Sequence, residues 1–202
     1  GAFVKSHPDL AAPDIQFHFM PLSGEGPGKG LHKFPGVIVS VCQLRPESRG
    51  VIEITSPDST VSPRIVSNYL AEDIDRRVLL DAMRLARRIV ARQPFAGLVV
   101  REVLPGTLAG SDDELMAFAR DFGTTIFHPS GTAKMGRDTM AVVDERLVVH
   151  GLEGLRVADV SIMPTMTSGN TNAPAIMIGE KASAMIIEDR RRVPRAASRP
   201  AA

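Results

Sequence analysis

The sequence predicts an α+β fold in which an antiparallel sheet is flanked by helices. β-branched and alternating runs come early in the chain, helical patterns are interspersed among them, and short hairpin-type turns dominate the connections. The chain has 202 residues, of which 44% are hydrophobic and 23% are charged. This composition is ordinary for a globular protein and is sufficient for one sizeable core with an appended element.

Composition also excludes several classes of function. The formal net charge of +1 gives no reason, in the bulk electrostatics, to expect nucleic acid or an anionic membrane surface as a partner. Cys42 is the single cysteine, so no disulfide can form within the chain, which fits a reducing compartment and predicts a cytoplasmic location. No apolar run approaches the roughly 18 residues that a membrane span needs. Residues 191–202 form an Arg-, Pro- and Ala-rich tail that we expect to be disordered.

The expected strands lie mostly in the first third of the chain. Residues 14–20 alternate apolar and polar side chains, as a strand with one wet face does. Runs 37–44 and 51–55 are rich in β-branched residues and are separated by the turn 46–50, so they are expected to pair as an antiparallel hairpin. Residues 23–34 form a glycine-containing loop that does not match the dinucleotide-binding pattern G-x-G-x-x-G.

Two helices follow. Residues 72–92 carry an apolar stripe at helical spacing, with acidic residues in the first turn and arginines near the last, which complements the helix dipole. Ser111 and Glu114 form a capping box for a second helix that runs to about Asp121. A short strand over 124–127 is then expected to deliver the chain to His128.

The last third is expected to contain short strands and one long helix. Apolar runs at 141–143 and 147–149 flank a turn, and residues 154–159 form a short buried strand that ends in Asp159. Residues 174–189 are apolar on one side and carry Pro174 in the first turn, which predicts a helix.

Two segments carry side chains suited to chemistry. His128 lies on a loop bounded by Pro and Gly, and an imidazole can accept a proton near neutral pH, although a single loop histidine is more often structural. Asn170, between Gly169 and Thr171, can donate and accept hydrogen bonds or only turn the chain. The helix that begins near Pro174 offers free N–H groups to an anion, but the residues alone favour a plain N-cap at Asn172.

Two other chemistries are not supported. A serine nucleophile would need G-x-S-x-G or a comparable arrangement, and the chain has none. The five histidines are scattered, and no H-x-x-x-H or cysteine pair is present, so no metal site is expected.

The combination of motifs is more specific than its parts. The chain contains, in order, His-Pro-Ser-Gly-Thr-Ala-Lys-Met-Gly at 128–136, Ala-Val-Val-Asp at 141–144, the run 149–164 and Gly-Asn-Thr-Asn-Ala-Pro at 169–174. This series resembles the C-terminal domain of the glucose–methanol–choline (GMC) flavin oxidoreductases. The turn Arg-Pro-Glu-Ser-Arg-Gly at 45–50 and the helix after it are similar to the substrate-binding portion of that family.

The resemblance implies a role for each matched position. His128 would be the base that takes the alcohol proton as hydride passes to flavin N5, and Asn170 would occupy the second catalytic position. An asparagine there resembles the choline and aliphatic-alcohol dehydrogenase branch. The implied cofactor is FAD, its site residues being Asp159 and Val160 at the phosphates and ribose, and Asn172 and Ala173 at the pyrimidine edge. Ile126 and Phe127 are expected to line an apolar substrate pocket.

The resemblance also implies a division of the chain by role. Residues 1–140 would form the substrate-binding domain, 141–190 would contribute to the FAD site and complete the FAD domain, and 191–202 would be the tail. The family's G-x-G-x-x-G is absent, so we expect a C-terminal fragment without the Rossmann domain. Such a fragment is expected neither to hold FAD tightly nor to turn over by itself.

The expected activity is oxidation of a primary alcohol, choline-like or aliphatic, to the aldehyde, with electrons passing to a quinone, an electron-transfer protein or oxygen. The chain has no Trp and one Tyr, which offers little of an aromatic cage and favours an uncharged alcohol over a quaternary ammonium. Membrane association would come only through the electron acceptor. The alternative is a non-catalytic fragment or interaction module that retains the fold.

Overall fold

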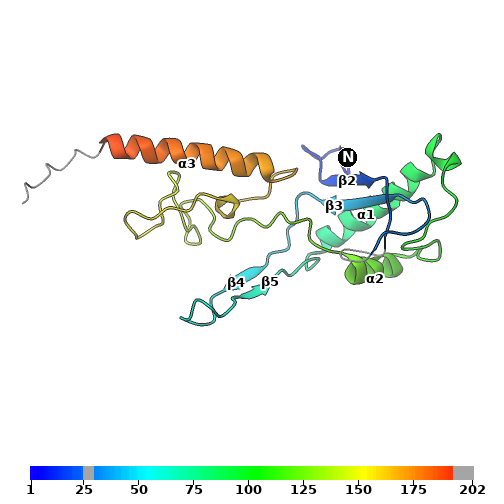
Figure 1. Ribbon diagram of the computed structural model, residues 1–202, viewed down its shortest axis with the longest axis horizontal. Coiled ribbons are helices and arrows are strands. Elements are labelled where there is room, and N and C mark those ends of the chain that lie inside the picture. The colour runs from blue at the N-terminus through cyan, green and yellow to red at the C-terminus, as the bar shows by residue number, and fades with distance from the viewer. Residues whose placement is uncertain (25–29, 193–202) are drawn as a thin grey trace, which may run out of the picture. The chain divides into compact units, whose positions relative to one another are not determined.

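The computed structural model describes residues 1–24 and 30–192, which divide into two compact units (Figure 1). Unit 1 comprises Gly1–Phe127, and unit 2 begins at His128. The predicted α+β class is confirmed, because the described residues form small antiparallel sheets and three α-helices. The expected division by role at residue 140 stays a prediction. The tail beyond residue 192 and residues 25–29 of the expected glycine loop lie outside the described residues.

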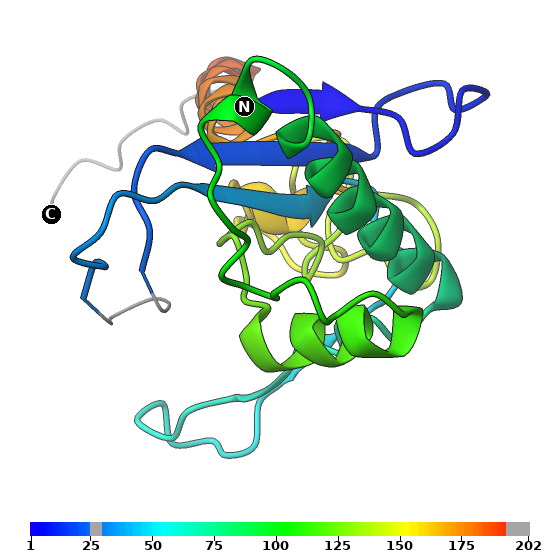
Figure 2. The ribbon, with the colours of Figure 1, turned by 90° about the vertical axis from the view of Figure 1, so that its right-hand side faces the viewer.

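The core of unit 1 lies between a three-stranded sheet and one long helix. Strands β1 (Ala2–Val4), β2 (Ile15–Met20) and β3 (Ile38–Gln43) pair antiparallel in the order β1-β2-β3. Helix α1 (Asp73–Val90) lies across one face of this sheet (Figure 2). The buried side chains at this contact are Ile15, Phe17, Val78 and Ala82.

The predicted hairpin between 37–44 and 51–55 is wrong. Strand β3 pairs instead with β2, and β4 (Val51–Glu53) pairs with β5 (Arg64–Val66) in a separate two-stranded sheet. The turn 46–50, which was expected to join the hairpin, is hydrogen-bonded to α1 instead. These bonds direct the chain away from the three-stranded sheet. A local pairing rule could not anticipate this long-range contact.

Asp75 is the residue that holds this turn. Its side chain is 1% exposed. The carboxylate accepts hydrogen bonds from Gln43 Nε2 at 2.7 Å, from the Glu47 N–H at 2.9 Å and from the Ser48 N–H at 2.8 Å. Burial disfavours the ionised form, but the donors from Glu47, Ser48 and Gln43 together outweigh it, and they hold the pKa of Asp75 below its ordinary value.

The second helix begins as predicted. In α2 (Asp112–Phe122) the Ser111 side chain accepts from the Glu114 N–H, and the Glu114 carboxylate accepts from the Ser111 N–H. Leu80 of α1 packs with the buried Leu115 and Met116 of α2. A 3-10 turn, η1 (Phe95–Gly97), follows α1.

Residues 124–127 do not form the predicted strand. The segment has no strand partner among the described residues, and a strand without a partner leaves its backbone groups unpaired. Phe127 has a left-handed backbone with φ of +63°, and its N–H donates to Thr125 Oγ1 at 3.0 Å. This local turn ends the extended chain.

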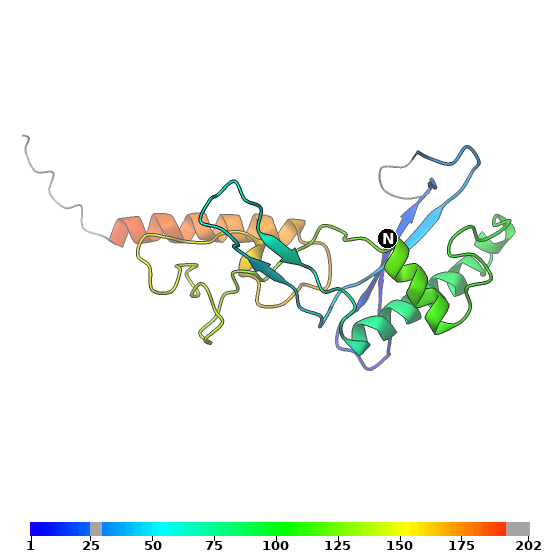
Figure 3. The same ribbon diagram turned by 90° about the horizontal axis from the view of Figure 1, so that it is seen from below.

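Unit 2 is built from loops packed on helix α3 (Asn172–Arg192), with one 3-10 turn, η2 (Val160–Ile162). Figures 1 and 3 show the loops running alongside α3. The predicted strands 141–143, 147–149 and 154–159 are present only as isolated bridges, such as those of Val143 with Val149 and of Val148 with Arg156. The buried side chains are Val143, Leu147, Ile162, Met163, Ile178 and Ala182.

A carboxylate turn explains why these runs do not continue as strands. The Asp144 side chain accepts from the Arg146 N–H at 2.8 Å and from the Val148 N–H at 2.9 Å. These bonds wind the chain tightly between the two apolar runs. Helix α3 exceeds the predicted 174–189 at both ends. None of the helices in the described part of the chain is long and apolar enough to cross a membrane.

Replacing Asp75 with Asn should lower the free energy of unfolding by about 3 kcal/mol at neutral pH, because an amide nitrogen would face donors that now meet a carboxylate. Urea denaturation measures this loss. The matched control is Asp81→Asn in the same helix, since Asp81 is 58% exposed and its carboxylate lies 3.9 Å from Arg84. The control should change stability by less than about 0.5 kcal/mol.

The loss of unfolding free energy in Asp75→Asn should also depend on pH. The pKa of Asp75 is lowered in the folded state, so its contribution is fully present above the ordinary carboxyl value near ~4 and is lost as pH falls through the folded value. The stability difference between wild type and Asp75→Asn should therefore begin to shrink below about pH 4 and vanish only as pH falls through the lower, folded-state pKa. A deficit that stays constant on acidification would contradict an ionised Asp75 anchor.

Candidate active site

The loop that carries His128 is bonded along its length to the segment around η2. The Ala133 N–H donates to the Ser161 carbonyl at 3.0 Å, and the Met135 N–H donates to the Ile162 carbonyl at 2.7 Å. Nearer to His128, Ser130 Oγ lies 3.4 Å from Met166 Sδ. Each bond joins parts of the chain that are about 30 residues apart in sequence, so the loop belongs to the fold of unit 2.

Glycine is required at one position of this loop. Gly131 has φ of +85°, a conformation that side chains with a Cβ rarely adopt. A Cβ added there would lie 3.2 Å from the Met163 carbonyl oxygen. The conformation and the close approach both place the His128 loop against the segment after η2.

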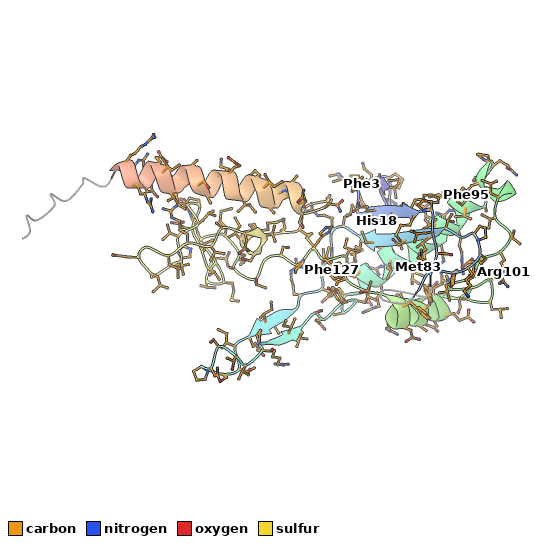
Figure 4. The ribbon with its side chains drawn as sticks, viewed as in Figure 1. Phe3, His18, Met83, Phe95, Arg101 and Phe127 are labelled. Atoms are coloured by element: carbon orange, nitrogen blue, oxygen red, sulfur yellow. The ribbon has the colours of Figure 1, made fainter. Side chains whose placement is uncertain are left out.

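His128 is the first residue of unit 2 and is half-buried. It directly follows Phe127, which Figure 4 labels and whose left-handed backbone turns the chain at this point. Within the described residues its imidazole has no hydrogen-bonding partner. The ring nitrogens are therefore available to a ligand.

Asn170 lies on the segment that leads from Met166 into α3, and its side chain is exposed. The next residue, Thr171, is only 7% exposed, and its carbonyl accepts from the Ala175 N–H at 2.9 Å. Thr171 thus occupies the N-cap position and Asn172 is the first helical residue, so the predicted cap at Asn172 is wrong. The helix begins one residue earlier because the buried Thr171 anchors it.

The first turn of α3 suits an electron-rich group. It contains no acidic residue, whereas α1 and α2 carry Asp73 and Asp112 in theirs. Asn172 and Ala173 are exposed there, so the positive end of the helix dipole and their N–H groups are not neutralised by a local carboxylate. The contact of these two residues with the pyrimidine edge of a flavin stays a prediction.

Asp159 and Val160 have structural roles in unit 2. The Asp159 carboxylate accepts from the Ser161 N–H at 2.7 Å and so caps η2, while its residue as a whole is exposed. Val160 is half-buried against the core. Their contact with FAD stays a prediction. The expected pocket residues Ile126 and Phe127 belong to unit 1 and are 38% and 80% exposed.

Sequence reasoning missed the ion pairs that fix the far end of α3. Arg146 Nη2 donates to Asp189 Oδ1 at 2.6 Å, and Arg156 donates to Asp189 Oδ2. Arg156, and then Arg146, hold the pKa of Asp189 below its ordinary value. Two arginines in apolar loops and an acid near a helix end were visible in the sequence, but their pairing depends on the fold.

Metal chemistry has no support in the described part of the chain. Residues 1–24 and 30–192 contain no group of three His, Cys, Asp or Glu side chains placed to hold an ion.

Comparison with known proteins identifies the family. The family model of GMC oxidoreductases matches residues 46–179, and the chain belongs to this family. An alcohol dehydrogenase [acceptor] of Pseudomonas putida is 41% identical over 187 residues, covering 93% of this chain and 34% of that protein. An oxygen-dependent choline dehydrogenase of Burkholderia ambifaria is 45% identical over 181 residues, covering 90% of this chain and 32% of that protein.

Solved structures agree with this assignment. Pyridoxine 4-oxidase from Mesorbium loti matches with a TM-score of 0.81 and 30% identity, covering 93% of this chain and 37% of that one. A formate oxidase of Aspergillus oryzae, in a study of its FAD modification, matches with a TM-score of 0.83 and 28% identity, covering 92% and 33%. The chain spans about a third of the length of the curated relatives it matches.

Replacing Gly131 with Ala should destabilise unit 2 by more than the same change at Gly151. Both positions have positive φ, +85° and +76°, which costs about 1 kcal/mol for a residue with a Cβ. Only Gly131 has a neighbour within 4 Å of the added Cβ, the Met163 carbonyl oxygen. Urea midpoints of the two variants measure the difference, and equal losses would show that the loop does not press on Met163.

Proposed function

We propose that this chain carries the reacting groups of an FAD-dependent oxidoreductase that oxidises an alcohol. Membership of the GMC family supports the class of reaction. The observation that carries the assignment of residues is the bonding of the His128 loop to residues 161–166, the segment that continues directly to Asn170. The two polar side chains of the proposed site therefore lie on loops that share one support.

Each residue has a distinct role in this proposal. His128 accepts the proton of the substrate hydroxyl, for which a half-buried imidazole without a hydrogen-bonding partner in residues 1–24 and 30–192 is suited. Asn170 orients the substrate oxygen by a hydrogen bond through its amide. When bound, FAD supplies the hydride acceptor. Asn172 and Ala173 at the start of α3 stabilise negative charge there, and one such preorganised donor contributes roughly 3 kcal/mol in comparable sites.

The proposed substrate is a primary alcohol, which becomes an aldehyde. The names of the relatives include both choline and alcohol dehydrogenases. A quaternary ammonium group favours an aromatic cage, and this chain has no Trp and a single Tyr, which is 67% exposed. We therefore favour an uncharged alcohol, with a quinone, an electron-transfer protein or oxygen as the electron acceptor. We also propose a cytoplasmic location.

Replacing His128 with Ala in a full-length protein that contains this chain should slow flavin reduction by alcohol by about 10² or more, because proton abstraction then falls to water. Anaerobic stopped-flow absorbance of the flavin measures the rate. His7→Ala is a matched control, because His7 is an exposed histidine whose side chain is 67% accessible. The control should leave the rate unchanged.

Two outcomes separate the residue assignment from the class of protein. If His128→Ala retains bound flavin and is reduced at the wild-type rate, His128 is not the base. If the wild-type full-length protein binds no flavin, the chain belongs instead to a non-catalytic member that retains the fold.

A further inference from the structure

The loop beyond the C-terminal end of α1 exposes an unusual amount of apolar surface. Within residues 95–110, Val100 is 97% exposed, Leu108 is 93% exposed and Leu98 is 77% exposed. Figures 1 and 3 place this loop at the end of unit 1 where α1 finishes. Single exposed apolar residues are ordinary, but several on one loop indicate a surface that contacts something apolar.

The loop is folded with its polar groups inward. Arg87 lies at the centre, and its guanidinium donates to the Glu102 carboxylate at 2.8 Å. The same guanidinium donates to the carbonyls of Ala109 at 2.7 Å and Gly106 at 3.1 Å. Arg87 thus gathers the carboxylate and two backbone carbonyls of the loop, whereas Leu98, Val100 and Leu108 stay on the outside.

Arginines gather at the end of α1 and on the loop itself, whereas the acidic residues 112–114 follow the loop in the first turn of α2. Arg88, Arg92 and Arg101 are exposed, and Figure 4 shows Arg101 and Phe95 at this end of the unit. Glu102 is the only acidic residue in the sequence from 86 to 110, and it is paired with Arg87. The exposed apolar tip is therefore accompanied by three arginines and by no free carboxylate of its own.

We propose that the 95–110 loop docks on the surface of an anionic lipid bilayer, with Leu98, Val100 and Leu108 entering the interface. Exposed apolar side chains gain from entering the acyl boundary, and neighbouring arginines gain from anionic headgroups. The three arginines favour a bilayer over a protein partner. Anionic headgroups would surround the inserted loop and could meet all three guanidinium groups at once. No helix in the described residues spans a membrane, so this contact lies on the surface.

A tryptophan probe tests the proposal on the 202-residue chain. The chain has no Trp, so Val100→Trp gives a signal from one site. Added vesicles of phosphatidylcholine with phosphatidylglycerol should shift its emission to the blue, and brominated acyl chains should quench it. Vesicles of phosphatidylcholine alone should have a smaller effect. Ile54→Trp is the matched control, because Ile54 is 89% exposed on the chain after β4, and its emission should not change.

The arginines are tested in the same background. Replacing Arg88, Arg92 and Arg101 with Gln should weaken binding of the Val100→Trp chain to anionic vesicles by about tenfold or more. Unchanged emission of Val100→Trp with anionic vesicles would overturn the proposal, as would an equal shift in Ile54→Trp. Blue-shifted emission of Val100→Trp without vesicles would also overturn it, because a second copy or another protein surface would then cover the loop.

Discussion

The structure of unit 2 depends on two backbone hydrogen bonds, from Ala133 to Ser161 and from Met135 to Ile162. They join the loop that begins at His128 to the segment around η2. Ile162 and the following Met163 are buried against α3, so the segment that accepts these bonds is itself fixed by the core. A proposed base on an otherwise irregular loop thereby acquires the rigidity that catalysis requires.

At other points of the chain, buried or paired carboxylates hold irregular segments in place by accepting several hydrogen bonds. Asp75 binds the turn after β3 to α1, Asp144 winds the loop below α3, and Asp189 binds two arginines at the far end of that helix. Each accepts several donors, as an ionised carboxylate can. Short strands and isolated bridges supply little cooperative backbone structure, so these side chains hold much of the irregular chain in place.

The elements that sequence predicted well are those whose signals are local. The apolar stripe of α1 and the capping box at Ser111 fix helices without reference to the rest of the chain. The pairing of β3 was missed because the contact of Asp75 with the turn is long-range. Residues 124–127 have a strand-like composition but no strand partner in the described chain. For the site, motif order singled out His128 and Asn170, whereas their shared support on the segment after η2 could come only from the fold.

The His128 loop is part of the folded core of unit 2, and amide hydrogen exchange of the 202-residue chain tests this most directly. The amides of Ala133 and Met135 should be protected, and they should exchange through the same opening as the Ala175 amide in the first turn of α3. Exchange of Ala133 and Met135 at the rate of an unstructured loop, while α3 stays protected, would contradict a rigidly held site.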